Sequence, residues 1–154
     1  ENPLVSCEDL KATSIDFANK IYEEAKELER FESSNKLIDS LRIIHRKYDL
    51  LRTLLWMNVL DIKENCGKFN TVVYLYKYDV DDIQINSKQN VWSKLLEDLK
   101  DERGDDIILI PIAVDQDITS LDYLVKTYRV EKFPAVIIND ENIFYEHKTV
   151  KDLE

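Results

Sequence analysis

The chain has 154 residues, of which 44% are hydrophobic and 34% charged, and its formal net charge is −10. This composition predicts a soluble globular protein with one domain, or with one small domain and an appendage. The negative charge argues against nucleic-acid binding, because no basic patch interrupts the acidic residues. No apolar run reaches the roughly 18–20 residues that a membrane span needs. The chain begins at Glu1 without a methionine, so we expect a processed protein or a fragment, which a signal or an anchor could have preceded.

Two helices are predicted in the first part of the chain. Apolar side chains recur at steps of three and four over residues 8–31, and again over residues 34–64 with the most regular period in the sequence. Ser33 or Ser34 is expected to break the chain between them and to cap the second helix. The second helix loses its polar face after Asp49, so its second half is expected to be buried on every side.

A different pattern follows Gly67, which is expected to end the second helix in the left-handed conformation. Ser87 is interpreted as the N-cap of a later helix, and Thr119 with Asp122 as a capping box. Residues 139–142 have the composition of a hairpin turn. The predicted elements are a strand at 71–78, a helix at 87–100, a strand at 107–114, a helix at 119–129, strands at 135–138 and 143–146, and the start of one more helix at 148–154.

The order β-α-β-α-β-β resembles that of the thioredoxin fold. The best-matching segments are Ile110–Asp115 (I-P-I-A-V-D) and Tyr128–Ile138, in which a helix ends in Tyr-Arg-Val and Phe133-Pro134 opens an apolar strand. The predicted fold is therefore α/β, with a thioredoxin-like core and a mixed sheet over residues 50–154. Residues 1–49, which lie outside the resemblance, are interpreted as an N-terminal helical extension that forms a hairpin with the rest of the second helix.

The resemblance also implies a site around a cis proline. The alternative for Phe133-Pro134 is a proline at the first position of a strand, where a missing N–H costs little. In the family, the residue before the cis proline pairs its main chain with an extended peptide, and a CxxC motif lies at the start of a nearby helix. Here no cysteine lies in residues 79–89, so thioredoxin-type redox chemistry is not expected at that position. The binding residues implied by the resemblance are Phe133, Pro134, Asn86, Ser87, Lys88 and Gln89.

No catalytic residue, metal site or cofactor is predicted. His45 and His147 are interpreted as surface or structural side chains. The carboxylates of Asp79, Asp81 and Asp82 could bind a cation, but a solvated turn is favoured because the segment lacks the pattern of a calcium loop.

The two cysteines, Cys7 and Cys66, open the first predicted helix and close the second. In an antiparallel hairpin these ends approach each other, although a turn near Ser33 would leave the second helix several residues longer. We favour a disulfide, which would close a loop of about 60 residues and contribute about 4 kcal/mol in the chain-entropy model. The alternative is two independent thiols. A disulfide would indicate an oxidising, extracytoplasmic compartment, for a secreted protein or a membrane-anchored domain, with the cytoplasm as the alternative.

The leading functional hypothesis is a redox-inactive, thioredoxin-like module that binds a protein or an extended peptide, as a chaperone-type module does. The alternative is a protein related to thiol-disulfide oxidoreductases that uses Cys66 or Cys7 as a non-standard redox cysteine. A third possibility is the soluble domain of a membrane-anchored protein whose function lies in another segment. A homodimer through the N-terminal helices is also considered, with Tyr22, Phe31 and Ile38 as its surface.

Overall fold

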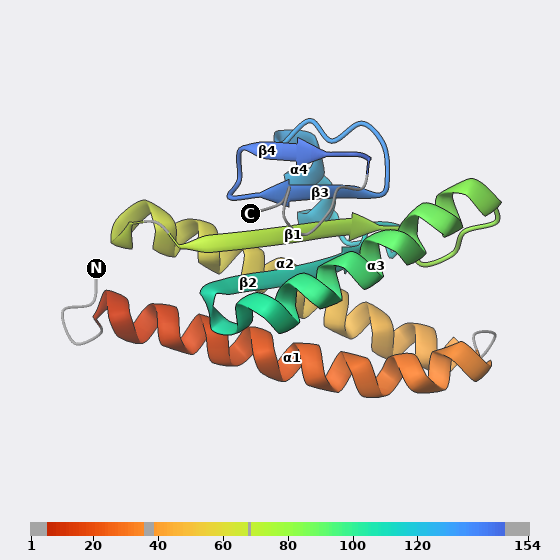
Figure 1. Ribbon diagram of the computed structural model, residues 1–154, viewed down its shortest axis with the longest axis horizontal. Helices are drawn as coiled ribbons and strands as arrows, with labels where there is room; N and C mark the ends of the chain where they lie inside the picture. The colour runs from red at the N-terminus through yellow and green to blue at the C-terminus, as the bar shows by residue number, and fades with distance from the viewer. Residues whose placement is uncertain (1–5, 36–38, 68, 147–154) are drawn as a thin grey trace. The chain divides into compact units, whose positions relative to one another are not determined.

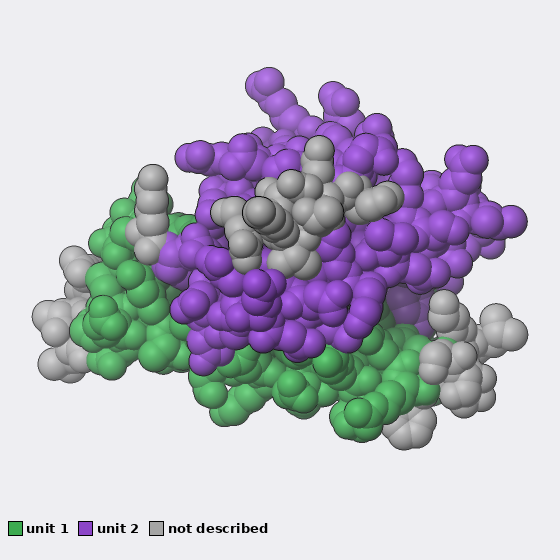
Figure 2. Space-filling model, in the orientation of Figure 1, with its two compact units in different colours: residues 1–68 green, residues 69–154 purple. Residues whose placement is uncertain are grey.

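The computed structural model describes residues 6–35, 39–67 and 69–146, without the side chains of 31 and 33–35. The chain forms two compact units, Glu1–Lys68 and Phe69–Glu154, which Figure 2 distinguishes by colour. The predicted boundary between residues 49 and 50 falls inside a helix of the first unit, so the structure assigns that whole helix to the N-terminal unit. Among the described residues, no helix is both long enough and apolar enough to cross a membrane.

The first unit is a pair of long helices, α1 (Cys7–Asn35) and α2 (Asp39–Cys66), which lie side by side and run in opposite directions (Figure 1). Their shared core contains Ile21, Ala25 and Leu28 from α1 and Tyr48 from α2, with Phe17, Leu41 and Leu51 packed against it. These residues follow the three-and-four spacing that predicted the hairpin.

The predicted helix break at Ser33 or Ser34 is wrong, because both residues lie in the last turn of α1. Neither proline nor glycine occurs in residues 31–35, and serine in a helix costs only a few tenths of a kcal/mol relative to alanine, roughly, so nothing there ends the helix. At the other end of the hairpin, Gly67 follows α2 with φ +84° and donates its N–H to the carbonyl of Lys63, as predicted.

The second unit is a mixed α/β structure. Its elements are β1 (Asn70–Tyr76), α3 (Ile83–Arg103), a short 3₁₀ turn (Gly104–Asp106), β2 (Ile107–Ala113), α4 (Thr119–Thr127), β3 (Ala135–Ile138) and β4 (Asn142–Phe144). The four strands form one sheet in the order β2-β1-β3-β4. β1 is parallel to β2 and antiparallel to β3, which is antiparallel to β4. The α/β class, the mixed sheet and the N-terminal helices are confirmed.

The burial of the strands and the turn between β3 and β4 follow from their sequences. β1 and β2 are buried along almost their whole length, as expected for strands that are apolar on both faces. Between β3 and β4, Asn139 and Asp140 both have positive φ, +51° and +64°, and Glu141 donates its N–H to the carbonyl of Ile138. Positive φ at both central residues of a tight turn matches the twist of the strands that it joins, and Asn and Asp tolerate it well. The hairpin prediction is confirmed, and the helix predicted at 148–154 lies outside the described residues.

One predicted helix start, that of α3, and one predicted helix cap, that of α4, are wrong. α3 begins at Ile83, four residues before the predicted start, because the carboxylate of Asp82 accepts hydrogen bonds from the N–H groups of Gln84 and Ile85. At α4, Thr119 is already helical and the N-cap is Ile118, which makes no side-chain cap. The capping box is therefore absent at α4; the N–H of Asp122 is bonded to the carbonyl of Ile118 instead.

Candidate functional site

The segment before β3 contains the proline on which the predicted site depends. The Phe133–Pro134 peptide bond is cis, as the sequence predicts. Pro134 is buried, Phe133 is half-buried and Lys132 is exposed. Pairing with β1 begins at Ala135, which lies opposite Leu75. Among the described residues, we find no hydrogen-bond partner for the main-chain N–H and C=O of Phe133.

The chain that leads to Phe133 is held by its own hydrogen bonds. α4 ends with Arg129 at φ +55°, where the N–H of Arg129 reaches the carbonyl of Lys126 and the N–H of Val130 reaches that of Val125. These two bonds form a Schellman motif, with an arginine in the position that glycine usually occupies. Further along, Glu131 donates its N–H to the Tyr145 hydroxyl at 3.2 Å. The chain that precedes Phe133 is thus held by hydrogen bonds, while the main-chain polar groups of Phe133 itself stay available.

The other predicted binding residues, Asn86, Ser87, Lys88 and Gln89, lie in the first two turns of α3 and not at its start. Ser87 is therefore not the N-cap, and the predicted loop over residues 79–89 ends at Asp82. The sequence signal for the true start is weak, because Ile83 is 80% exposed and adds nothing to the apolar period of the helix. Asn86 and Ser87 are exposed, and the ammonium of Lys88 lies 3.0 Å from the carboxylate of Glu146.

Gln89 has a structural role that the sequence analysis missed. Its side chain is buried, its Oε1 accepts the N–H of Lys77 at 2.8 Å, and its Nε2 donates to the carbonyl of Lys77 at 3.0 Å. The amide thus completes the hydrogen bonding of the residue that follows β1. The Tyr74 hydroxyl donates to the main-chain carbonyl of Gln89 at 3.2 Å, and burial raises the pKa of Tyr74. Gln89 ties α3 to β1, and the structure gives no sign that it faces a ligand.

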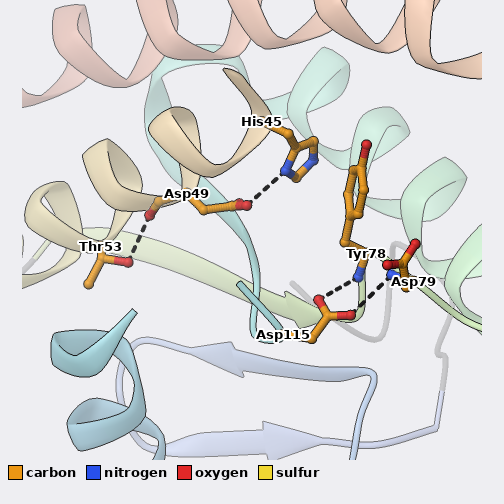
Figure 3. A network of polar contacts seen from close by, with 6 residues as sticks. All are labelled: His45, Asp49, Thr53, Tyr78, Asp79 and Asp115. Carbon is orange, nitrogen blue, oxygen red and sulfur yellow. Dashed lines mark hydrogen bonds and ion pairs between the residues drawn. The ribbon is translucent and has the colours of Figure 1, made fainter. Parts of the chain in front are cut away.

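Asp115 organises the chain beyond the ends of the parallel strands. Its carboxylate accepts the N–H of Tyr78 at 2.7 Å and the N–H of Asp79 at 3.0 Å (Figure 3). In the sequence, Asp115 is only the last residue of the segment Ile110–Asp115, and no local pattern indicates that it fixes the chain after β1. In the described part of the chain, no group of three or more His, Cys, Asp or Glu side chains could hold a metal ion.

A second polar network lies within α2. His45 and Asp49, one helical turn apart, are both buried, and the His45 Nδ1 lies 2.7 Å from the Asp49 Oδ2. The Thr53 hydroxyl donates to the main-chain carbonyl of Asp49 at 2.8 Å (Figure 3). The structural interpretation of His45 is confirmed, and His147 lies outside the described residues.

The predicted disulfide between Cys7 and Cys66 is present, with an S–S distance of 2.04 Å and a Cα–Cα distance of 5.4 Å. It therefore uses both cysteines of the chain. The expected mismatch in helix length does not arise: α1 has 29 residues and α2 has 28, because α1 continues to Asn35. The outer ends of the hairpin are consequently level.

Of the predicted dimer surface, only the side chain of Tyr22 lies in the described part of the chain, so dimerisation through these residues stays a prediction. Tyr22 is half-buried, with the Lys26 ammonium 4.9 Å from the centre of its ring. The side chain of Phe31, and Ile38 as a whole, lie outside the described part of the chain. Large exposed apolar side chains instead gather on α2: Ile43, Ile44, Leu50, Leu54 and Met57.

Comparison with known proteins finds no family model, no curated protein and no solved structure that matches this chain.

Proposed function

We propose that the second unit is a redox-inactive, thioredoxin-like module that binds extended polypeptide at Phe133–Pro134, as a chaperone-type interaction domain does. The described order β1, α3, β2, α4, β3, β4 is the β-α-β-α-β-β order on which the resemblance rests, and it supports this reading.

The observation that carries the proposal is the main chain of Phe133. A backbone N–H and C=O that lack partners in a half-buried position cost free energy, and an extended peptide could satisfy both. Binding by added main-chain pairing is a common mode of peptide recognition, in which the neighbouring side chains supply the specificity. Phe133, next to the exposed Lys132 and before the first paired residue of β3, would offer such an edge.

Redox chemistry at this position is not part of the proposal. The first turns of α3 hold Asn86, Ser87, Lys88 and Gln89, none of which can attack a disulfide as a thiolate does. Both cysteines belong to the hairpin unit and are bonded to each other. This disulfide is the basis for proposing an oxidising, extracytoplasmic location.

A matched pair of peptides tests the proposed main-chain pairing. A fluorescent extended peptide that binds the protein would be compared, by anisotropy titration, with the same peptide carrying N-methyl groups on alternate amides. The methylated peptide should bind at least about tenfold more weakly: it lacks the N–H that the Phe133 carbonyl would accept, and its methyl group keeps the peptide carbonyl away from the Phe133 N–H, so two net hydrogen bonds of about 1 kcal/mol each are lost. Equal affinity of the two peptides would refute the proposed pairing.

Two protein variants locate the binding position. Phe133→Asp places a carboxylate beside the pairing edge, where a bound peptide would desolvate it, and should weaken binding at least about tenfold. Tyr123→Asp is the control, because Tyr123 is a 70% exposed aromatic side chain on α4 of the same unit. If both variants bind the peptide equally well, the site is not at Phe133.

The redox alternative has a separate assay. Insulin reduction by the wild-type protein should not exceed the uncatalysed rate, whereas turnover that disappears in Cys66→Ser would establish the alternative function.

A further inference from the structure

Helix α2 carries a stripe of apolar side chains that are exposed. Ile43, Leu50, Leu54 and Met57 are 70%, 42%, 46% and 44% exposed. They are separated by seven, four and three residues, so they share one face of the helix. The residues of α2 in the hairpin core, such as Tyr48, belong to a different face.

Two charged residues belong to the same face. Lys47, between Ile43 and Leu50, and Asp61, after Met57, are both exposed and follow the same alternating steps of four and three. The Lys47 ammonium lies 5.4 Å from the centre of the Tyr48 ring on its own helix. Lys47 precedes Leu54 by seven residues and Asp61 follows Leu54 by seven. Leu54 therefore has opposite charges at equal distances before and after it in the helix.

This symmetry selects one kind of partner. If two copies of α2 pack antiparallel about a two-fold axis at Leu54, Lys47 of one copy lies opposite Asp61 of the other, and the reverse pair forms as well. The same alignment brings Leu50 of one copy beside Met57 of the other, so apolar side chains fill the centre. A parallel alignment would place Lys47 against Lys47 and Asp61 against Asp61, which is unfavourable.

We propose that this stripe is the interface of an antiparallel homodimer, in which two α1–α2 hairpins meet through α2. The interface is isologous, since each copy contributes the same residues. Three apolar side chains a copy, Leu50, Leu54 and Met57, make a contact smaller than a standard interface, so the dimer is weak and depends on concentration. The proposal is independent of peptide binding by the second unit.

Sedimentation velocity tests the dimer by measuring the mass of the protein between about 10 µM and 1 mM, at an ionic strength of about 0.15 M. The wild-type mass should rise towards that of two chains as the concentration increases. Leu54→Glu should stay monomeric with an unchanged far-ultraviolet circular dichroism spectrum, because it places two carboxylates at the two-fold axis. A wild-type protein that is monomeric throughout, or a Leu54→Glu variant that dimerises as the wild type does, overturns the proposal.

Charge exchange tests the antiparallel register. Lys47→Glu and Asp61→Lys alone should each weaken dimerisation at least about tenfold, because two attractive pairs become repulsive. The double variant restores both pairs with the charges exchanged and should dimerise like the wild type. Lys20→Glu and Glu23→Lys, which make the same charge changes at exposed positions of α1, should leave the dissociation constant unchanged. A double variant that stays as weak as the single ones refutes the register.

Discussion

Gln89 provides the sharpest test of how the second unit is held together. The resemblance placed this residue among the peptide-binding positions, whereas the structure buries it and bonds its amide to both polar groups of the Lys77 main chain. Gln89→Met keeps the length of the side chain and removes both hydrogen bonds. The variant therefore separates a structural role from a binding role.

The expected loss follows from the two bonds. Each net hydrogen bond contributes about 1 kcal/mol, and the N–H and C=O of half-buried Lys77 regain only part of this from water. Gln89→Met should lower the free energy of unfolding by about 2 kcal/mol. For a chain of this size, that loss corresponds to a decrease in Tm of about 4–8 °C.

Urea unfolding followed by tryptophan fluorescence measures this change, since Trp92 of α3 is completely buried. Asn86→Met is the matched control: Asn86 lies on the same helix one turn earlier and is exposed, so its replacement should change the stability by less than about 0.5 kcal/mol. The structural reasoning is refuted if Gln89→Met is as stable as the control and instead weakens peptide binding.

Two other predictions concern the disulfide and alkaline stability. Replacing both Cys7 and Cys66 by serine should lower the free energy of unfolding by about 4 kcal/mol, since the disulfide closes a loop between residues 59 positions apart. Urea unfolding measures this change, and a loss below about 1 kcal/mol would contradict the prediction. Burial raises the pKa of Tyr74 above the value of about 10 that tyrosine has in an unfolded chain, so the folded protein keeps this proton where the unfolded chain loses it. The stabilisation from Tyr74 is thus complete below about pH 10 and lost above it, by up to about 1.4 kcal/mol per pH unit. Tyr74→Phe should be less stable than the wild type at pH 8, because its hydrogen bond to Gln89 is gone. Above pH 10 its free energy of unfolding should fall less steeply with pH than that of the wild type. Urea unfolding between about pH 8 and 11 measures both proteins, and the same dependence of stability on pH in the two would exclude this assignment.

Apolar periodicity predicted the elements of this protein well. The three-and-four spacing gave the two N-terminal helices, and the β-branched and aromatic runs gave the strands, because burial of one or both faces leaves its trace directly in the sequence. β3 occurs at the predicted residues, and Asn139 and Asp140 form the predicted turn. The disulfide was favoured from the positions of the cysteines at the two helix ends, although two separate thiols remained possible.

Helix caps were predicted poorly, for a local reason. The N-cap of α3 is Asp82, five residues before Ser87, and the N-cap of α4 is Ile118 although the sequence from Thr119 to Asp122 fits a capping box. A single side-chain hydrogen bond decides such a boundary, and several nearby residues in the sequence can supply it.

The sequence by itself determined the α/β class, the helical hairpin and the absence of a cysteine from residues 79–89, because composition and period carry that information. Only the tertiary structure decided that Gln89 serves the main chain of Lys77 and that Asp115 accepts the N–H groups of Tyr78 and Asp79. It likewise showed the exposed stripe on α2, which the sequence analysis had read as part of an all-round buried helix. These features depend on which side chains the fold brings together and which it leaves in solvent. Contacts between residues far apart in the chain leave no local pattern in the sequence, so the sequence alone does not reveal them.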